Sequence, residues 1–475
     1  MKKKIREHIK RQIALFFAFC LCLSSFSITS VYAEPEETTT GPDYMAEAEA
    51  RKSQSIQSNQ IISWPQGPAI GAEGAILMEA NTGAILYAKN IDEKLYPAST
   101  TKILTTLVAM DHVEDLQEMV KFSHNAVFSI ERDSSNMGMD EGQSITVEQC
   151  LYGILVYSAN EVCNAIAEHI AGSTEAYVEL MNQKAAELGC TNSHFVTTNG
   201  LHDTEHYTTP RDLATIGCAF FNNDLLAKIS GTAHYYIGPT PTQPDDIDLY
   251  THNQLTKGTY SYEGYIGGKT GFTSDARQTL VSCAERNGIK LVCVIMKEES
   301  PNQFTDTMAL FDYGFQNFQK VNVAEHEKDY IIHDEDMYHI ENNIFYQSES
   351  VVSIDEESAV ILPNTAVFED LEGTLSYENL SEGCFAHILY NYNGQLVGRA
   401  KILLNAEDDS AGFMSNSEKQ KRVIFINMKY VLTILVIVVT ALVILTLLIS
   451  YYQSYNFTRR RRFTIKGVKN RHRRR

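Results

Sequence analysis

The chain has 475 residues, of which 40 are basic, 59 are acidic and 44% are hydrophobic. This length predicts two or three domains, and the ordinary globular composition excludes a collagen, a coiled coil or a wholly disordered chain. The charge is divided unevenly, because residues 34–418 carry 20 basic and 58 acidic side chains, a net charge of −38. A segment with this much negative charge repels the phosphate backbone of DNA or RNA, so nucleic acid is not an expected partner.

The N-terminus has the pattern of a secretory signal peptide at residues 1–33. Six basic side chains accompany the start of this segment, and an apolar run follows at 13–23. Val31 and Ala33 are the small residues that precede a cleavage site, and the apolar run is too short to favour an uncleaved anchor. The acidic segment 34–57 has no apolar periodicity, which predicts a flexible spacer.

The pattern of residues 58–318 predicts one domain that contains both strands and helices. Two β-hairpins lie far apart in it, at 75–89 and 279–296, and each is turned by an Asn-containing loop. Segments with a helical pattern lie between the hairpins, at 99–110, 147–171 and 176–188. Residues 193–212 predict a loop. Hairpins near both ends, with helices between them, suggest one sheet that both ends of the domain complete.

The pattern changes at about residue 319 to short β segments, which predict a small β domain over 319–405. Its clearest hairpin comprises 387–391 and 396–404, around the turn Asn393-Gly394. Seven cysteines remain once the signal peptide is removed, and they include no CxxC pair. A domain of this size needs no disulfide framework, so most of these cysteines are expected to be buried apolar residues, although a disulfide pair stays open.

The C-terminal part predicts a polar tether at 406–428 and a single transmembrane helix at 430–452. No charged side chain occurs between Lys429 and Arg459. A helix of about twenty residues, at a rise of about 1.5 Å each, spans the ~30 Å hydrocarbon core. Arginine runs in the tail 453–475 place that tail in the cytoplasm by the positive-inside rule. The acidic body is therefore expected outside the cell membrane, on a single-pass anchor.

Three short motifs carry reactive side chains. The first, Ser99-x-x-Lys102, begins a predicted helix and puts a hydroxyl and an amine on the same helical face. Serine is a poor nucleophile until a base takes its proton, and lysine can do so only if burial or another cation lowers its pKa. Backbone amides at the helix N-terminus add donors for an oxyanion. Alone the motif is weak, because an N-cap serine near a surface lysine has the same spacing.

The second motif is Ser-Ala-Asn at 158–160, and the third is Lys-Thr-Gly at 269–271. A strand with a glycine at this position lets a substrate backbone approach closely. The ammonium of Lys269 can bind a carboxylate, and its charge can also lower the pKa of Lys102. Each motif is weak alone. In this order, with gaps of about 60 and 110 residues, the three form a strong joint signal.

The motifs together resemble those of the penicillin-binding protein and serine β-lactamase superfamily. More narrowly, the chain resembles the low-molecular-mass D-alanyl-D-alanine carboxypeptidases of the peptidase S11 type, with similar text at 75–87, 96–102, 199–201 and 206–212. The resemblance covers roughly 58–405. It implies an α/β (α+β) fold of the β-lactamase/transpeptidase type, whose antiparallel sheet is flanked by helices and followed by the small β domain and one transmembrane helix.

The resemblance also implies a catalytic role for three residues. Ser99 would be the nucleophile that forms an acyl-enzyme, Lys102 would be its general base, and Ser158 would relay a proton to the leaving amine. The substrate-binding residues would be Asn160, Lys269, Thr270, Gly271 and Phe272. Among these, the lysine and the threonine would hold the terminal carboxylate, and the backbone amide of Phe272 would complete the oxyanion hole with that of Ser99.

The implied reaction removes the terminal D-alanine from peptidoglycan stem pentapeptides at the bacterial cell membrane. β-Lactams would acylate the same serine, and no metal or organic cofactor is implied. Rival functions stay open at this point: a β-lactamase of the same superfamily, a non-catalytic β-lactam sensor or wall-binding protein, and an endopeptidase. The nearest approach to the deacylating E-x-x-L-N loop of a β-lactamase is Glu179-Leu-Met-Asn182, which has the wrong spacing.

One further pattern points to a metal. Residues 202–206 read His-x-x-Glu-His, which matches the inverted zinc-protease motif. That chemistry needs both histidines on one face of a helix. The flanking Asn199-Gly200 and Thr209-Pro210 make a helix an unfavourable prediction here, so a structural loop with His206 packed near the site is preferred.

Overall fold

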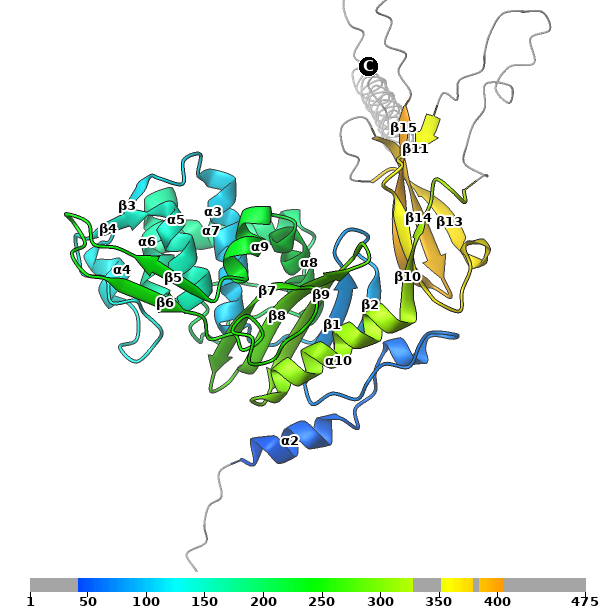
Figure 1. Ribbon diagram of the computed structural model, residues 1–475, viewed down its shortest axis with the longest axis horizontal. Helices are drawn as coiled ribbons and strands as arrows, with labels where there is room; N and C mark the ends of the chain where they lie inside the picture. The colour runs from blue at the N-terminus through cyan, green and yellow to red at the C-terminus, as the bar shows by residue number, and fades with distance from the viewer. Residues whose placement is uncertain (1–41, 328–351, 379–383, 405–475) are drawn as a thin grey trace, which may run out of the picture. The chain divides into compact units, whose positions relative to one another are not determined.

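The structure is a computed structural model that describes residues 42–327, 352–378 and 384–404. Its first part is built on a five-stranded antiparallel sheet (Figure 1). The sheet has the order β2-β1-β9-β8-β7, and the strands are β1 (Gly74–Glu79), β2 (Ile85–Lys89), β7 (Tyr265–Thr273), β8 (Arg277–Arg286) and β9 (Ile289–Glu298). β1 pairs with β9, so the two distant hairpins do join in one sheet, as the sequence predicted.

Both faces of this sheet are covered, because successive side chains of each strand point to opposite sides. Ile76 belongs to the apolar cluster that contains the helix α8 (Pro210–Phe221), whereas Leu77 belongs to the cluster that contains α10 (Asn302–Asn317). Figure 1 shows α10 running along the sheet. Six further helices contribute to the apolar cluster on the α8 side, namely α3 (Lys102–His112), α4 (His124–Phe128), α5 (Val147–Tyr152), α6 (Asn160–Ala171), α7 (Thr174–Glu187) and α9 (Asp224–Ser230).

The helix predicted over 147–171 is not continuous. α5 ends at Tyr152, a π-helical turn follows at Gly153–Tyr157, and Ser158 adopts a left-handed conformation with φ +67° before α6 begins. Such turns interrupt the helical hydrogen-bond ladder and are often found at functional sites. The prediction of one helix was wrong here, because apolar periodicity continues through a break that only the backbone geometry reveals.

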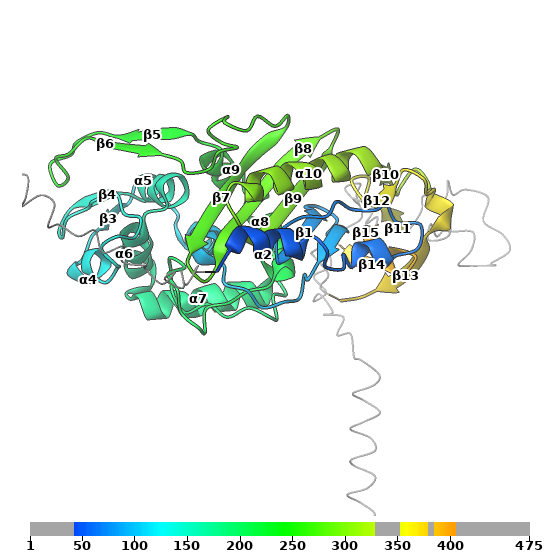
Figure 2. The same ribbon diagram turned by 90° about the horizontal axis from the view of Figure 1, so that it is seen from below.

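Several elements were not predicted. Helices α8, α9 and α10 were missed, and α8 starts inside the segment 193–212 that was expected to be a loop, with Pro210 at its first turn. A hairpin of β5 (His234–Ile237) and β6 (Ile247–Tyr250) was also missed. Figure 2 shows this hairpin running past the short pair β3 (Met119–Lys121) and β4 (Ser144–Thr146).

The second part of the described chain is a β-sheet of six strands. Its path is β10-β12-β15-β14-β13, with β11 paired to β15, and the strands are β10 (Phe318–Asn322), β11 (Val352–Ile354), β12 (Ala359–Pro363), β13 (Glu372–Ser376), β14 (Cys384–Tyr392) and β15 (Gln395–Leu404). Trp64 packs against this sheet, with its ring 5.2 Å from that of Phe318, and its Nε1–H donates to Leu86 O at 2.9 Å. β structure is therefore present where the sequence placed the small β domain.

The spacer predicted at 34–57 is partly wrong. Residues 44–51 form the helix α2 (Tyr44–Arg51), whose first turn is capped by the side chain of Asp43. Arg51 at its end is buried and donates from Nε to Gly71 O at 2.7 Å. The absence of apolar periodicity misled the prediction, because this segment is held by polar and cation–π contacts rather than by an apolar stripe.

The expected signal peptide, tether, transmembrane helix and tail lie outside the described residues. Among the residues that are described, no helix is both long enough and apolar enough to cross a membrane. The seven cysteines between 150 and 384 are all free thiols, and six of them are buried. This agrees with the expectation that most of them serve as small apolar side chains.

Candidate active site

Ser99 lies in a tight turn at the end of the loop that leads from β2 to α3. The preceding residue, Ala98, has φ +49°, and a 3₁₀ turn at Ala98–Thr101 runs directly into α3 at Lys102. This winding places the two side chains on the same face, as the spacing predicted. The Lys102 Nζ lies 2.8 Å from the Ser99 Oγ.

Lys102 is completely buried, and its amine touches three oxygens. Besides Ser99 Oγ, Nζ lies 2.7 Å from Asn160 Oδ1 and 2.6 Å from the carbonyl oxygen of Asn199. Burial disfavours the charged ammonium and lowers the pKa of Lys102 to about 8. An amine with that pKa has a usable neutral fraction at neutral pH, which is what a proton acceptor for Ser99 needs.

Lys269 approaches the same region from strand β7. Its Nζ donates to Ser158 Oγ at 3.0 Å and to the carbonyl oxygen of Thr270 at 2.8 Å. Burial, together with the charge of Lys102, lowers the pKa of Lys269 well below its usual value. The left-handed turn at Ser158 is what points this hydroxyl back towards the second lysine.

Strand β7 and the Ser99 turn are in close backbone contact. A Cβ on Gly271 would lie 2.9 Å from Ser99 N and 3.0 Å from Pro97 O, so only glycine leaves room for this approach. Thr279 on β8 fixes the same turn, because its Oγ1 donates to Pro97 O at 2.9 Å. Phe272, the next residue of β7, therefore brings its backbone close to Ser99.

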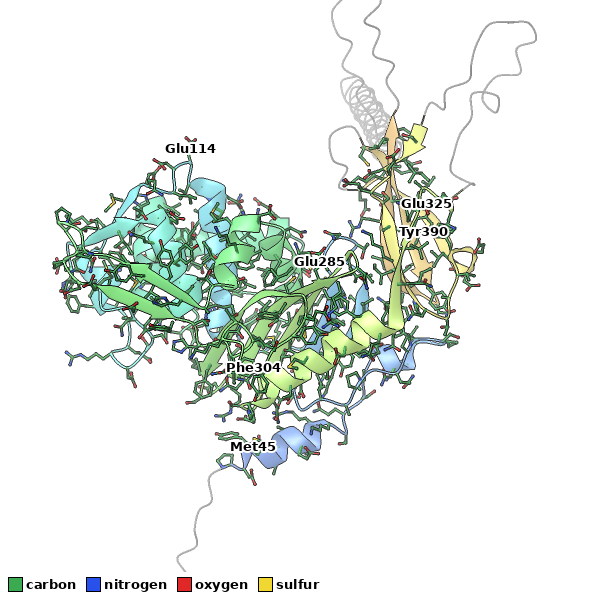
Figure 3. The ribbon with its side chains drawn as sticks, in the orientation of Figure 1. Met45, Glu114, Glu285, Phe304, Glu325 and Tyr390 are labelled. Atoms are coloured by element: carbon green, nitrogen blue, oxygen red, sulfur yellow. The ribbon has the colours of Figure 1, made fainter. Side chains whose placement is uncertain are left out.

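These elements surround a cleft of about 920 Å³. Six of the eight expected site residues line it, namely Ser99, Ser158, Asn160, Thr270, Gly271 and Phe272. The other two, Lys102 and Lys269, are buried behind its wall. Phe304, labelled in Figure 3, lines the cleft from the start of α10. The structure thus brings together all eight residues from three separate stretches of chain.

The two histidines of the His-x-x-Glu-His pattern lie in a loop and have separate partners. His206 is buried, its Nδ1 accepts the N–H of Val196 at 3.0 Å, and its Nε2 therefore donates to Thr101 Oγ1 at 2.8 Å. Burial lowers the pKa of His206 to about 4. His202 packs edge-on against the ring of Tyr96. Over the described ranges, no cluster of three or more His, Cys, Asp or Glu side chains could hold a metal ion.

Three contacts of the site were not foreseen from the sequence. The carbonyl of Asn199 meets Lys102, and Gly200 beside it has φ +82° and no room for a Cβ against Ala98. The His206–Thr101 hydrogen bond supports the turn that carries Ser99. An Asn-Gly pair signals a tight turn. Nothing local indicates, however, that its carbonyl will meet an amine 97 residues earlier.

Arg277, at the start of strand β8, is occupied in an ion pair. Its guanidinium donates to Glu299 through two hydrogen bonds of 2.7 and 2.6 Å. The same group lies 3.7 Å from the ring centroid of Tyr44 in α2 and 5.6 Å from that of Phe272. Arg277 therefore links the N-terminal helix to the rim of the cleft.

Comparison with known proteins identifies relatives of this chain. Residues 61–300 match the family model of D-alanyl-D-alanine carboxypeptidases, peptidase S11. The chain is 34% identical over 269 residues to the D-alanyl-D-alanine carboxypeptidase DacB2 of Mycobacterium tuberculosis, which covers 55% of this chain and 87% of that relative. It is 31% identical over 253 residues to DacF of Bacillus subtilis, covering 52% of this chain and 63% of the relative.

The three-dimensional structure agrees with this. It resembles the crystal structure of penicillin binding protein 5 from Haemophilus influenzae, with a TM-score of 0.55 and 27% identity, over 72% of this chain and 98% of the other. A match of that extent is longer than residues 42–327, so it includes part of the β-sheet that follows. With the motifs, the fold and half of its length in agreement, this chain belongs to the peptidase S11 family of D-alanyl-D-alanine carboxypeptidases.

Proposed function

We propose that this protein is a serine D-Ala-D-Ala carboxypeptidase that removes the terminal D-alanine from peptidoglycan stem pentapeptides. The observation that carries the proposal is the 2.8 Å contact between Lys102 Nζ and Ser99 Oγ, beside a cleft that is also lined by Ser158, to which the second buried lysine, Lys269, donates a hydrogen bond. The names of the family and of its relatives support the same activity.

In the first half of the reaction, neutral Lys102 accepts the Ser99 hydroxyl proton as the serine oxygen attacks the carbonyl carbon of the penultimate D-alanine. The backbone amides of Ser99 and Phe272 stabilise the oxyanion. The C–N bond then breaks, and Ser158, held by Lys269, passes its proton to the leaving amine and takes up the proton that Lys102 had accepted, so that Lys102 is neutral again. This leaves an acyl ester on Ser99 and free D-alanine. Water then attacks the ester carbon while its proton passes to Lys102. The bond between that carbon and Ser99 Oγ breaks, Lys102 returns the proton to Ser99 Oγ, and the shortened peptide leaves with a free carboxylate.

Substrate orientation depends on the opposite wall of the cleft. Lys269 and Thr270 bind the carboxylate of the terminal D-alanine, and Asn160 binds the amide of the preceding residue. Gly271 lets the extended substrate lie beside β7. A substrate carboxylate favours the charged form of Lys269, so binding offsets the depression of its pKa that burial causes.

β-Lactams are expected to acylate Ser99 and to leave slowly. The rival β-lactamase function is not favoured, because the candidate deacylating residue Glu179 lies exposed on helix α7, away from the cleft-lining residues. Of the described acidic residues, Glu131, Asp133 and Asp275 line the cleft, and none of them belongs to a segment with the E-x-x-L-N pattern.

The cellular location is part of the same proposal. Export by the signal peptide 1–33, anchorage by the helix 430–452 and a cytoplasmic tail at 453–475 would place the cleft outside the bacterial cell membrane, where peptidoglycan lies. These assignments rest on charge and hydropathy in the sequence. The β domain at 319–405 and the tether 406–428 would then hold the catalytic domain 58–318 away from the bilayer.

The test uses the full-length protein in detergent, with a peptide that ends in D-Ala-D-Ala and a fluorescent penicillin. We expect D-alanine release and stable labelling, both lost in Ser99→Ala. Ser134→Ala is the matched control, because this serine lines the same cleft and its hydroxyl donates a hydrogen bond within its own loop, to Glu131 O. Labelling without peptide turnover would indicate a sensor, and rapid penicillin hydrolysis would indicate a β-lactamase. Either result contradicts the proposal.

A further inference from the structure

The hairpin of β5 and β6 packs on the protein with one face only. On this inner face, Tyr235 stacks on Tyr152 of α5 with a centroid distance of 3.6 Å, and Leu249 is buried. Figure 2 shows the hairpin next to α5. Successive side chains of a strand point to opposite sides, so Tyr236 and Tyr250 lie on the outer face, where they are 50% and 54% exposed. Two large aromatic side chains of one short hairpin therefore face solvent.

The side chains of the outer face hold one another in place. His234 lies directly opposite Tyr250 in the β-ladder, and the two rings stack with their centroids 4.4 Å apart. His234 Nε2 lies 2.6 Å from Asp248 Oδ1, and the hydroxyl of Tyr236 donates to Asp246. Side chains that are already fixed lose little conformational freedom when a ligand binds. The outer face thus combines fixed aromatic rings with carboxylates beside them.

This outer face continues along the chain to the catalytic cleft. Beyond Tyr250 the next exposed residue is His252, and Thr251 between them is buried. The backbone N–H of Thr251 donates to Ala233 O at 3.0 Å, which extends the pairing of the two strands past the end of β6. His252 and Gln254 line the cleft. A row of exposed side chains therefore leads from the hairpin to the cleft that contains Ser99.

The chemistry of the outer face fits a sugar chain. The C–H groups of a pyranose ring pack against the electron-rich face of an aromatic ring, and its hydroxyls donate strong hydrogen bonds to carboxylates. The negative charges of Asp246 and Asp248, on an acidic protein, disfavour an anionic partner. The proposed substrate is itself attached to a sugar chain. Because an extended pentapeptide spans at most about 18 Å, the glycan strand that carries it lies just outside the cleft.

We propose that the outer face of the β5–β6 hairpin, formed by His234, Tyr236, Asp246, Asp248 and Tyr250, is a binding site for the glycan strand of peptidoglycan. The choice of this ligand rests on the proposed function, which makes peptidoglycan the substrate. The inference goes beyond that function, because none of these five residues lines the catalytic cleft. Binding at the hairpin holds the polymer beside the cleft and so raises the effective concentration of its stem peptides there.

The test measures binding of the full-length protein, in detergent, to immobilised glycan strands from which the stem peptides have been removed. The unmodified protein should bind. In the double variant Tyr236→Ala, Tyr250→Ala the Kd should rise at least about tenfold, because both stacking rings are lost. Tyr377→Ala is the matched control, because this tyrosine is 61% exposed but lies in the β domain, and it should bind glycan as the unmodified protein does. Glycan binding that is unchanged in the double variant would overturn the inference.

A second measurement separates glycan binding from catalysis. In the double variant, D-alanine release from a free pentapeptide should be unchanged, whereas release from intact peptidoglycan should need a higher concentration of polymer. An equal loss on both substrates would contradict the inference, because it would show that the hairpin supports the cleft itself.

The remaining outcomes are also distinguishable. If the double variant does not fold, Tyr236→Ala alone decides: weaker glycan binding supports the inference and unchanged binding contradicts it. A loss of self-association in gel filtration with glycan binding intact would indicate a contact between copies of this chain and would contradict the inference as well. An unmodified protein that binds glycan but releases no D-alanine from the free pentapeptide would instead contradict the proposed function.

Discussion

Gly271 offers the most direct perturbation of the site, because replacing its hydrogen with a methyl group acts on the contact between β7 and the Ser99 turn. In Gly271→Ala the new Cβ would clash with Thr279 Oγ1 and would lie 2.9 Å from Ser99 N and 3.0 Å from Pro97 O. Favourable contacts between such atoms lie at about 3.5 Å or more, so strand and turn must separate by roughly 0.5–1 Å.

That separation moves the two expected oxyanion donors apart. Loss of one such donor typically lowers the rate by about 100- to 1,000-fold, and a 1 Å misplacement alone can cost about 100-fold. We therefore expect the second-order rate of acylation by penicillin to fall at least about 100-fold, equivalent to about 3 kcal/mol in the activation free energy. D-Alanine release should fall with it.

The assay is the time course of fluorescent penicillin labelling, with thermal unfolding measured in parallel to show that the variant folds. Gly238→Ala is the control, because a Cβ there meets only the ring of Tyr236, at 3.5 Å or more, and should leave the rate unchanged. A folded Gly271→Ala protein that is acylated within about threefold of the unmodified rate would refute the assignment of this contact to the oxyanion site.

Three further predictions concern buried titratable groups. With a Lys102 pKa of about 8, the fraction of neutral, reactive amine rises from about 9% at pH 7 to about 50% at pH 8, so the rate of acylation should increase about fivefold. An acylation rate that does not change between pH 7 and pH 8 would be inconsistent with Lys102 as the base. Burial raises the pKa of Glu298 to about 8 in the folded state, from an ordinary value of about 4.5. Between these two pH values the folded protein keeps a proton that the unfolded chain has lost. The free energy of unfolding therefore falls as the pH rises from about 4.5 to about 8. Glu298→Gln should therefore raise the urea midpoint at pH 8 more than at pH 5, and an equal change at both would argue against this origin. His206→Phe leaves Thr101 and the Val196 amide without their partner and should lower the free energy of unfolding by about 2–4 kcal/mol in urea denaturation; unchanged stability would show that the two hydrogen bonds contribute little.

Some of the fold was predictable because local patterns carry it. The alternation and turn residues at 75–89 and 279–296 were sufficient for both hairpins, and two hairpins with unpaired edges were sufficient to expect one sheet. α2 and α10 were not predicted. α2 depends on contacts such as the cation–π pair of Tyr44 and Arg277, and such contacts leave no periodic signal in the sequence.

The segment 147–171 was expected to be one helix, but the structure divides it into two helices. Its apolar residues keep a helical period on both sides of Ser158, so the sequence alone indicates one element. The chain nevertheless inserts a π turn and one left-handed residue, because that geometry lets Ser158 reach Lys269 while the apolar residues before and after it stay in the core. A strained residue is retained where the surrounding structure over-determines it.

The order and spacing of three short motifs were enough to predict the candidate site residues Ser99, Lys102, Ser158, Asn160 and the Lys-Thr-Gly strand. Only the folded structure shows that Lys102 is fully buried and that Asn160 and Asn199 contact its amine. The physical reason is that proton affinity depends on desolvation and on charges within a few ångströms. Those quantities are properties of the folded interior, where residues 58 to 111 positions apart meet.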